Sequence, residues 1–98
     1  MNIDKKIENE NVILKVAGRL DTTTAPELEK TLDSVLEGTK ELVFDMTDLE
    51  YISSAGLRVL LATQKTMNKQ GSMVIRNVNE TIAEVFEITG FADMLTIE

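Results

Sequence analysis

Two adjacent serines, Ser53 and Ser54, stand where a polar loop meets the start of an apolar helical pattern, and Ala55 and Gly56 follow them. A hydroxyl at a helix N-terminus is a good phosphate acceptor, because free N–H groups and the positive end of the helix dipole face the added charge. We expect Gly56, in the first turn, to leave the backbone uncovered. Serines also cap helices through the same hydroxyl, so the residues alone leave modification and capping both open.

Three aspartates and a run of threonines are the other side chains suited to chemistry. Asp21 opens the segment Asp21-Thr22-Thr23-Thr24, and Asp45 and Asp48 lie in the stretch before the serines. These carboxylates can hold a hydroxyl or a metal ion, but Asp and Thr also stabilise turns by bonding their own backbone. Since the chain has no His and no Cys, we predict neither a metal site nor a cofactor.

The composition of the chain favours binding over catalysis. Its 98 residues include no Cys and no His, which excludes disulfides, Cys/His zinc sites, thiol nucleophiles and the Ser–His–Asp triad. A net charge of -7 argues against binding to the phosphate backbone of nucleic acids. No apolar run approaches the roughly 20 residues needed to cross a bilayer, and the N-terminus has no secretory signal. We therefore expect a cytoplasmic protein with no nucleic-acid or membrane partner.

Short apolar stretches alternate with helical patterns along the chain. Strands are predicted over residues 3–10, 12–17, 42–46, 73–76 and 95–97, with Gly18 ending the second of them. The run 42–46 holds one Asp among apolar residues, which predicts a strand buried on both faces. Four methionines are predicted core residues: Met46, Met67, Met73 and Met94.

Three helices are predicted from apolar residues spaced at three and four positions. They begin at Thr24, at Ser53 or Ser54, and at Asn79, and they end at Gly38, Gly71 and Gly90. The first is expected to start with a capping box, in which Thr24 is the N-cap and Glu27 follows three positions later.

This order of elements predicts an α/β fold, a small mixed β-sheet with helices packed mostly on one face, in a single domain over residues 1–98. Strand–helix–strand units connect parallel neighbours through right-handed crossovers. In such sheets, binding sites gather at the carboxyl ends of the strands. We therefore expect Asp21, Asp45, Asp48 and the two serines to meet at one end of the sheet.

Three motifs, in this order and at this spacing, resemble the STAS domain family, and within it the single-domain anti-sigma factor antagonists of bacteria. The first is Gly18-Arg19-Leu20-Asp21 with its threonine-rich loop, and the second is Leu42-Val43-Phe44-Asp45-Met46. The third is Tyr51-Ile52-Ser53-Ser54-Ala55-Gly56-Leu57, followed by Val59-Leu60-Leu61. The resemblance covers nearly the whole chain and implies a STAS-like fold.

The resemblance implies a partner switch controlled by phosphorylation rather than an enzyme. In the family, an unphosphorylated antagonist binds an anti-sigma factor that is also a serine-protein kinase, and the sigma factor is thereby freed. The kinase uses ATP to phosphorylate one serine of the antagonist, which is then released, and a separate serine phosphatase resets it.

The position of the family's acceptor serine, two residues before a Gly-Leu pair, makes Ser54 the acceptor in this chain. Immediately before the acceptor the family usually has Asp, whereas this chain has Ser53, which is therefore a second candidate acceptor. The residues implied in partner binding are Asp21, Thr22, Thr23, Asp45, Ser53, Ala55, Gly56 and Arg58.

Two other functions are compatible with the residues. The chain can be a non-phosphorylated STAS subunit of a larger assembly, such as a lipid-transport or sensory complex, in which Ser54 is only a helix cap. It can also be an enzyme acting on nucleotides through its aspartates, although it has no Gly-rich phosphate loop of the G-x-x-x-x-G-K-[ST] kind.

Overall fold

Five strands and three helices make up the computed structural model, which describes residues 1–98. The strands are β1 (Asn2–Glu8), β2 (Asn11–Leu20), β3 (Glu41–Asp45), β4 (Leu49–Ile52) and β5 (Ser72–Arg76). The helices are α1 (Ala25–Val35), α2 (Ser54–Asn68) and α3 (Glu80–Ile88), and a short 3-10 helix, η1 (Phe91–Asp93), follows the last of them. None of these helices has both the length and the apolar composition that a membrane crossing requires.

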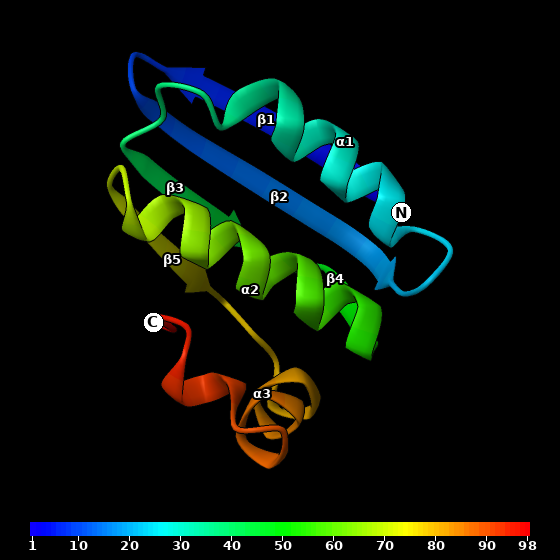
Figure 1. Cartoon of the computed structure of the whole chain (residues 1–98). Coiled ribbons are helices and arrows are strands. Elements are labelled where there is room, and N and C mark those ends of the chain that lie inside the picture. The colour runs from blue at the N-terminus through cyan, green and yellow to red at the C-terminus, as the bar shows by residue number, and fades with distance from the viewer.

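The sheet is mixed, and its order is β1-β2-β3-β5, with β4 pairing beside the far part of β2. β1 and β2 are antiparallel, whereas β2 with β3, β3 with β5, and β2 with β4 are parallel. Figure 1 shows α1 and α2 side by side on one face of the sheet, while α3 lies below α2 in this view. The predicted fold, a mixed sheet with helices mostly on one face, is confirmed.

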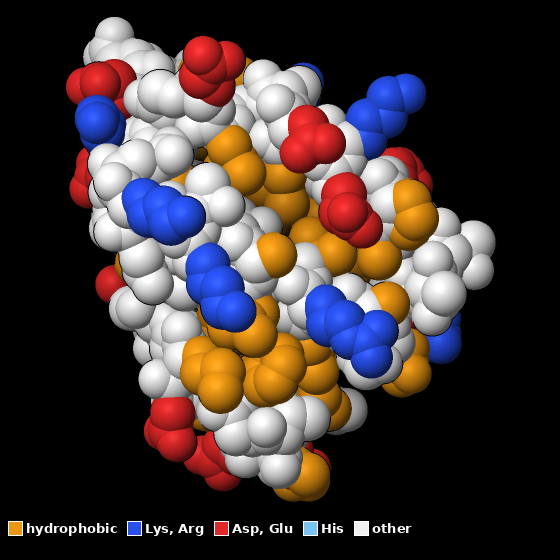
Figure 2. All heavy atoms as spheres, viewed as in Figure 1, with side chains coloured by type: hydrophobic (Ala, Val, Ile, Leu, Met, Phe, Trp, Pro, Cys, Tyr) orange, Lys and Arg blue, Asp and Glu red, His pale blue; other side chains and the backbone are white.

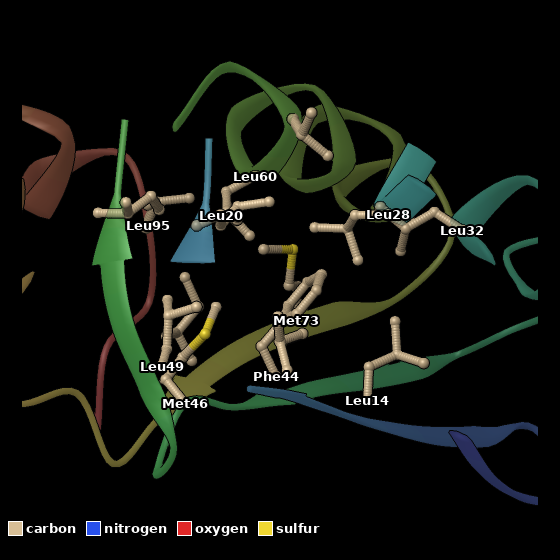
Figure 3. Packing of buried hydrophobic residues seen from close by; sticks show 14 of the residues in the cluster. Leu14, Leu20, Leu28, Leu32, Phe44, Met46, Leu49, Leu60, Met73 and Leu95 are labelled. Atoms are coloured by element: carbon tan, nitrogen blue, oxygen red, sulfur yellow. The ribbon is translucent and has the colours of Figure 1, made fainter. Parts of the chain in front are cut away.

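Most of the core lies between the sheet and the helices α1 and α2, and Phe86 of α3 belongs to the same cluster. On β2, the alternating residues Val12, Leu14 and Val16 are buried, because every second side chain of a strand points to the same face. Side chains from the sheet and the helices point toward one another in this layer (Figure 3). The largest fully buried side chains are Phe44, Phe86, Leu14, Leu20, Leu28, Leu42, Met46, Leu49, Leu60, Met67, Met73 and Ile75.

The opposite face of the sheet has no covering helix, and this corrects one expectation. In β3, Leu42 and Phe44 are buried, but Val43 and Asp45, which alternate with them, are only half-buried. The prediction of a strand buried on both faces was therefore wrong, because the central strand of a sheet with one open face still alternates.

The sequence pattern did not predict β4. β2 does not end at Gly18, whose φ of +95° belongs to the left-handed region that favours glycine. The strand continues to Leu20, with a register shift between Gly18 and Arg19. Its first half pairs with β3, and its last residues pair with β4, so that one long strand supports two shorter ones.

The C-terminal residues do not form the strand predicted over 95–97. The chain instead turns through η1, and Ile75 and Ile97 make an isolated bridge. The Ile75 N–H donates to the Thr96 carbonyl at 2.9 Å, and the Glu98 N–H donates to the Ile75 carbonyl at 2.9 Å. Met94 follows η1 and is 54% exposed, so its assignment to the core was wrong, whereas the other three methionines are buried.

The third helix begins where the sequence predicted. Asn79 is its N-cap, and the Asn79 side chain accepts a hydrogen bond from the Ile82 N–H at 2.9 Å. The second helix ends at Asn68, three residues before the predicted stop at Gly71, and the first ends at Val35, three residues before Gly38.

The open face of the sheet can be tested with two neighbouring truncations. We expect Leu42→Ala to reduce the free energy of unfolding by about 2–5 kcal/mol, because it leaves a cavity in the core. Val43→Ala should cost only about 1 kcal/mol, because its side chain packs against no helix. Chemical denaturation of the two variants measures both values, and equal losses would contradict the open face.

Candidate partner-binding site

The two serines lie at the start of α2, but their side chains are in different surroundings. Ser53 occupies the N-cap position with an extended backbone, and its N–H donates to the Leu20 carbonyl of β2 at 2.9 Å. Ser53 Oγ is buried and has no hydrogen-bond partner. Ser54, the first residue of the helix, is exposed. No side chain caps this helix, so the capping role open to either serine is not seen in the structure.

Gly56 brings the beginning of α2 close to the sheet. A Cβ atom at this position would lie 2.6 Å from Leu20 Cγ and 2.9 Å from Ile52 Cγ1, which is closer than such atoms approach. Gly56 is buried, so the expectation that it would leave the backbone uncovered was wrong. Its function is close packing, which fixes the helix start against β2 and β4 and leaves Ser54 outside.

The threonine-rich loop between β2 and α1 is organised by Asp21. Asp21 Oδ1 accepts hydrogen bonds from the Thr23 N–H at 3.0 Å and the Thr24 N–H at 3.1 Å. The Thr24 hydroxyl donates to the Arg19 carbonyl at 2.7 Å and accepts from the Asp21 N–H at 2.9 Å. The predicted capping box does not form, because Thr24 is held by the loop behind it and makes no cap bond.

These contacts lower the pKa of the Asp21 carboxyl group. The hydrogen bond from the Thr24 N–H, with further ones from the Thr23 N–H and the Thr24 hydroxyl, holds the pKa of Asp21 below its ordinary value. The Arg19 guanidinium, whose Nε lies 3.8 Å from Asp21 Oδ2, acts in the same direction. Arg19 also lies over the Tyr51 ring at 4.3 Å from its centroid. Asp21 is therefore a charged residue that fixes the shape of the loop.

Asp45 and Asp48 lie elsewhere, which corrects the expectation that all the aspartates meet. Asp45 is opposite Lys15 in the β2–β3 register, and Asp48 forms an ion pair with Lys15 at 3.4 Å. Ser53 bonds to Leu20, five residues further along β2 and roughly 16 Å away at about 3.3 Å per residue. The chain covers this distance through β4, which lies between Asp45 and Ser53 in the sequence. No group of three or more acidic side chains capable of holding a metal ion is present.

Asp45 is held in its own cluster of hydrogen bonds. Asp45 Oδ1 accepts from the hydroxyl and the N–H of Thr47, and from Asn77 Nδ2 at 3.1 Å. The Thr47 hydroxyl, followed by the Thr47 N–H and Asn77, holds the pKa of Asp45 below its ordinary value. Asp45 thus shapes the turn that leads from β3 to β4.

A groove between α1 and α2 opens beside the serines. It has a volume of about 470 Å³. Figure 2 shows hydrophobic surface on this side of the molecule, with acidic and basic side chains around it. The residues that line the groove are Thr22, Ala25, Pro26, Glu29, Leu32, Asp33, Leu36, Ala55, Arg58, Val59, Ala62, Thr63 and Thr66.

The groove joins part of the predicted site and adds residues to it. Thr22, Ala55 and Arg58 line it, and Thr23 is exposed in the adjoining loop. Glu29 and Asp33 of α1 also line the groove, although they were not among the residues predicted for the site. Their four-residue spacing on one helix face was visible in the sequence, but nothing in it indicated that this face meets α2.

The sequence of the whole chain matches one family. The model of the STAS domain family matches residues 2–98. The chain belongs to the STAS domain family. This STAS domain is 33% identical over 98 residues to the anti-sigma-B factor antagonist of Bacillus subtilis (strain 168), and the match covers 99% of this chain and 90% of that protein. The chain is therefore a homologue of bacterial anti-sigma factor antagonists.

The same fold occurs in solved structures of the Bacillus anti-sigma factor antagonist SpoIIAA. Its unphosphorylated form superposes with a TM-score of 0.84 at 15% identity, covering 99% of this chain and 88% of that one. Its phosphorylated form gives a TM-score of 0.76 at 16% identity, covering 99% and 91%. At such identities the likeness concerns the fold alone, and it agrees with the predicted STAS-like architecture.

The close approach at Gly56 predicts that a larger residue at this position of the STAS domain would clash with its neighbours. We expect Gly56→Ala to lower the free energy of unfolding by about 1–3 kcal/mol, because the new methyl group overlaps Leu20 and Ile52. Urea denaturation measures the loss. Ser54→Ala, an exposed change on the same helix turn, is the matched control and should stay within about 0.5 kcal/mol. Equal stability of the two variants would contradict the close contact.

The lowered pKa of Asp45 predicts an acid-sensitive contribution to stability. Because folding favours the ionised form, the contribution is present above the unfolded pKa of about 3.9 and is lost as pH falls through the lower folded pKa. Asp45→Asn should therefore lose less stability than the parent chain between pH 7 and pH 3. Denaturation at both pH values tests this. An equal loss of stability in the two proteins between these pH values would contradict the role given to the ionised Asp45 carboxylate.

Proposed function

We propose that this STAS domain is an anti-sigma factor antagonist that works as a phosphorylation-controlled partner switch. Unphosphorylated, it binds an anti-sigma factor that is also a serine-protein kinase, in the cytoplasm of a bacterium. Phosphorylation of Ser54 by that kinase releases it, and a serine phosphatase restores the binding form. The exposed hydroxyl of Ser54, at the first residue of α2, carries the proposal together with the homology to anti-sigma-B factor antagonists.

The different surroundings of the two serines favour Ser54 as the acceptor. A kinase must reach the hydroxyl with its ATP, and Ser54 is exposed. Ser53 Oγ is buried, and the Ser53 backbone is tied to β2 through Leu20. Phosphorylation at Ser53 would therefore require the start of the helix to open, whereas phosphorylation at Ser54 would not.

The effect of the phosphate is expected in the interface rather than in the fold. The Ser54 side chain makes no hydrogen bond that modification would break, and a phosphate at a helix N-terminus is favoured by about 0.3–2 kcal/mol. A dianion buried against a partner without a matched cation costs several kcal/mol. A loss of about 4 kcal/mol already lowers affinity about a thousandfold. SpoIIAA, which has the same fold, is known in unphosphorylated and phosphorylated forms.

We also propose that the chain acts by binding and has no catalytic activity of its own. Without His and Cys, the aspartates are the remaining candidates for acid–base chemistry. Asp21 and Asp45 lie at separate places, and each is used in the turn that it stabilises. Purified protein that turned over a nucleotide, and lost the activity in Asp45→Ala, would contradict this part of the proposal.

Ser54→Asp should fold normally and lose its kinase partner, because the added charge lies at the centre of the proposed interface. Binding is measured by calorimetry with the purified anti-sigma factor kinase of the same organism, and folding by circular dichroism. We expect affinity to fall at least tenfold, while Ser54→Ala retains binding. Phosphosite mapping of protein from growing and stressed cells should find phosphate on Ser54, with an occupancy that changes.

Ser72→Asp is the matched control, since it places the same charge on an exposed residue at the start of β5. It should bind like the parent chain. If the folded Ser54→Asp variant bound as tightly as the control, the partner switch would be contradicted. A stable co-purifying assembly that ignored this substitution would indicate a fixed STAS subunit instead.

A further inference from the structure

Arg58 stands four residues after Ser54 on α2, and both side chains are exposed. Residues at this spacing are neighbours on a helix surface, with Cβ atoms about 5–6 Å apart. An acidic group four residues before a basic one is the favourable order, because it also agrees with the helix dipole. A phosphate on Ser54 would therefore stand within reach of the Arg58 guanidinium.

In the unmodified chain, Arg58 has no anionic partner. The three ion pairs of the molecule are made by Lys15, Arg19 and Arg76, and Arg58 takes part in none of them. The first turn of α2 contains no acidic residue, and no side chain bonds its free N–H groups. The beginning of the helix thus combines an unpaired cation with unpaired backbone donors.

Arg58 also belongs to the groove between α1 and α2. It is the only basic residue among those that line the groove, where it stands with Glu29 and Asp33 of α1. The position of its side chain therefore decides whether this surface carries a cation beside two carboxylates or carries the carboxylates alone.

We propose that Arg58 is the residue that binds the phosphate of phosphorylated Ser54, and that this pairing withdraws its charge from the groove. The inference rests on the proposed phosphorylation of Ser54 and names how the chain itself responds to it. A guanidinium presents a planar fork of donors that matches phosphate oxygens, so the pair is held by charge-assisted hydrogen bonds. The phosphorylated surface then differs in two places, at Ser54 and along the groove.

The pairing of Arg58 with the phosphate would also change the contacts of a bound partner. A carboxylate of the partner that pairs with Arg58 in the unmodified complex would lose its cation to the phosphate. It would then face Glu29 and Asp33 as well as the new dianion. Release therefore combines repulsion at Ser54 with loss of an attractive contact in the groove.

The other charged groups near the start of α2 are already engaged. Arg19 of β2 is the rival cation, but it lies over the Tyr51 ring and beside Asp21. Asp21 Oδ1 already accepts hydrogen bonds from N–H groups of its own loop. Glu29 faces the groove from α1. Arg58 is thus the cation free to reorient toward a phosphate.

A ³¹P NMR titration of chain carrying phosphoserine at position 54, installed during translation, tests the pairing without a kinase. The phosphate has a second pKa near 6, and a neighbouring cation lowers it by favouring the dianion. We expect Arg58→Gln to raise this pKa by roughly 0.2–0.4 unit relative to the phosphorylated parent. Arg58→Lys, which keeps the charge without the fork, should give an intermediate value.

Two further variants make the result specific. Lys65→Gln removes one exposed positive charge further along α2 and should leave the phosphate pKa unchanged. Equal pKa values in the parent and Arg58→Gln, with both folded by their amide spectra, would overturn the proposal. A phosphate pKa that is raised by Arg19→Gln and not by Arg58→Gln would also overturn it. Because no kinase is used, these outcomes are independent of whether the kinase-binding experiment on Ser54→Asp succeeds.

Discussion

The parallel pairing of β4 with the last residues of β2 is the constraint on which the site depends. It places Ser53 beside Leu20, where a backbone hydrogen bond of 2.9 Å fixes the point at which the chain becomes helical. Gly56 then allows the helix to lie directly on Leu20 and Ile52. The position of Ser54 is therefore determined by backbone pairing and close packing, and its own side chain contributes nothing to holding it there.

This arrangement would suit the phosphorylation that we propose for Ser54. Removing or adding groups at Ser54 disturbs no internal hydrogen bond, while neighbouring elements keep the surface around it in shape. Asp21 fixes the loop on one side through its hydrogen bonds to Thr23 and Thr24. The two helices form the groove on the other side. A charge added at Ser54 would therefore change the surface without breaking the contacts that hold the fold.

The sequence predicted the architecture well and the site in part, for physical reasons that differ between elements. β2 and β3 were predicted because each contains a run of branched or other apolar residues. β4 has no such run, and its two buried residues, Leu49 and Ile52, are three positions apart instead of two. Because β4 was not predicted, Asp45 was wrongly expected to lie beside the serines. The groove could not be predicted from the sequence either, because it is formed by the contact of two helices that are separate in the sequence.

The short bridge between Ile75 and Ile97 has a consequence for self-association. An unpaired strand at the edge of a sheet offers its N–H and C=O groups to any other chain. At β5 the C-terminal residues already occupy these groups, and Glu98 adds an ion pair with Arg76 at 2.9 Å. At the other edge, β1 carries a row of charged side chains, Asp4, Lys5, Lys6 and Glu8. Both edges thus discourage strand-to-strand addition between copies of this chain.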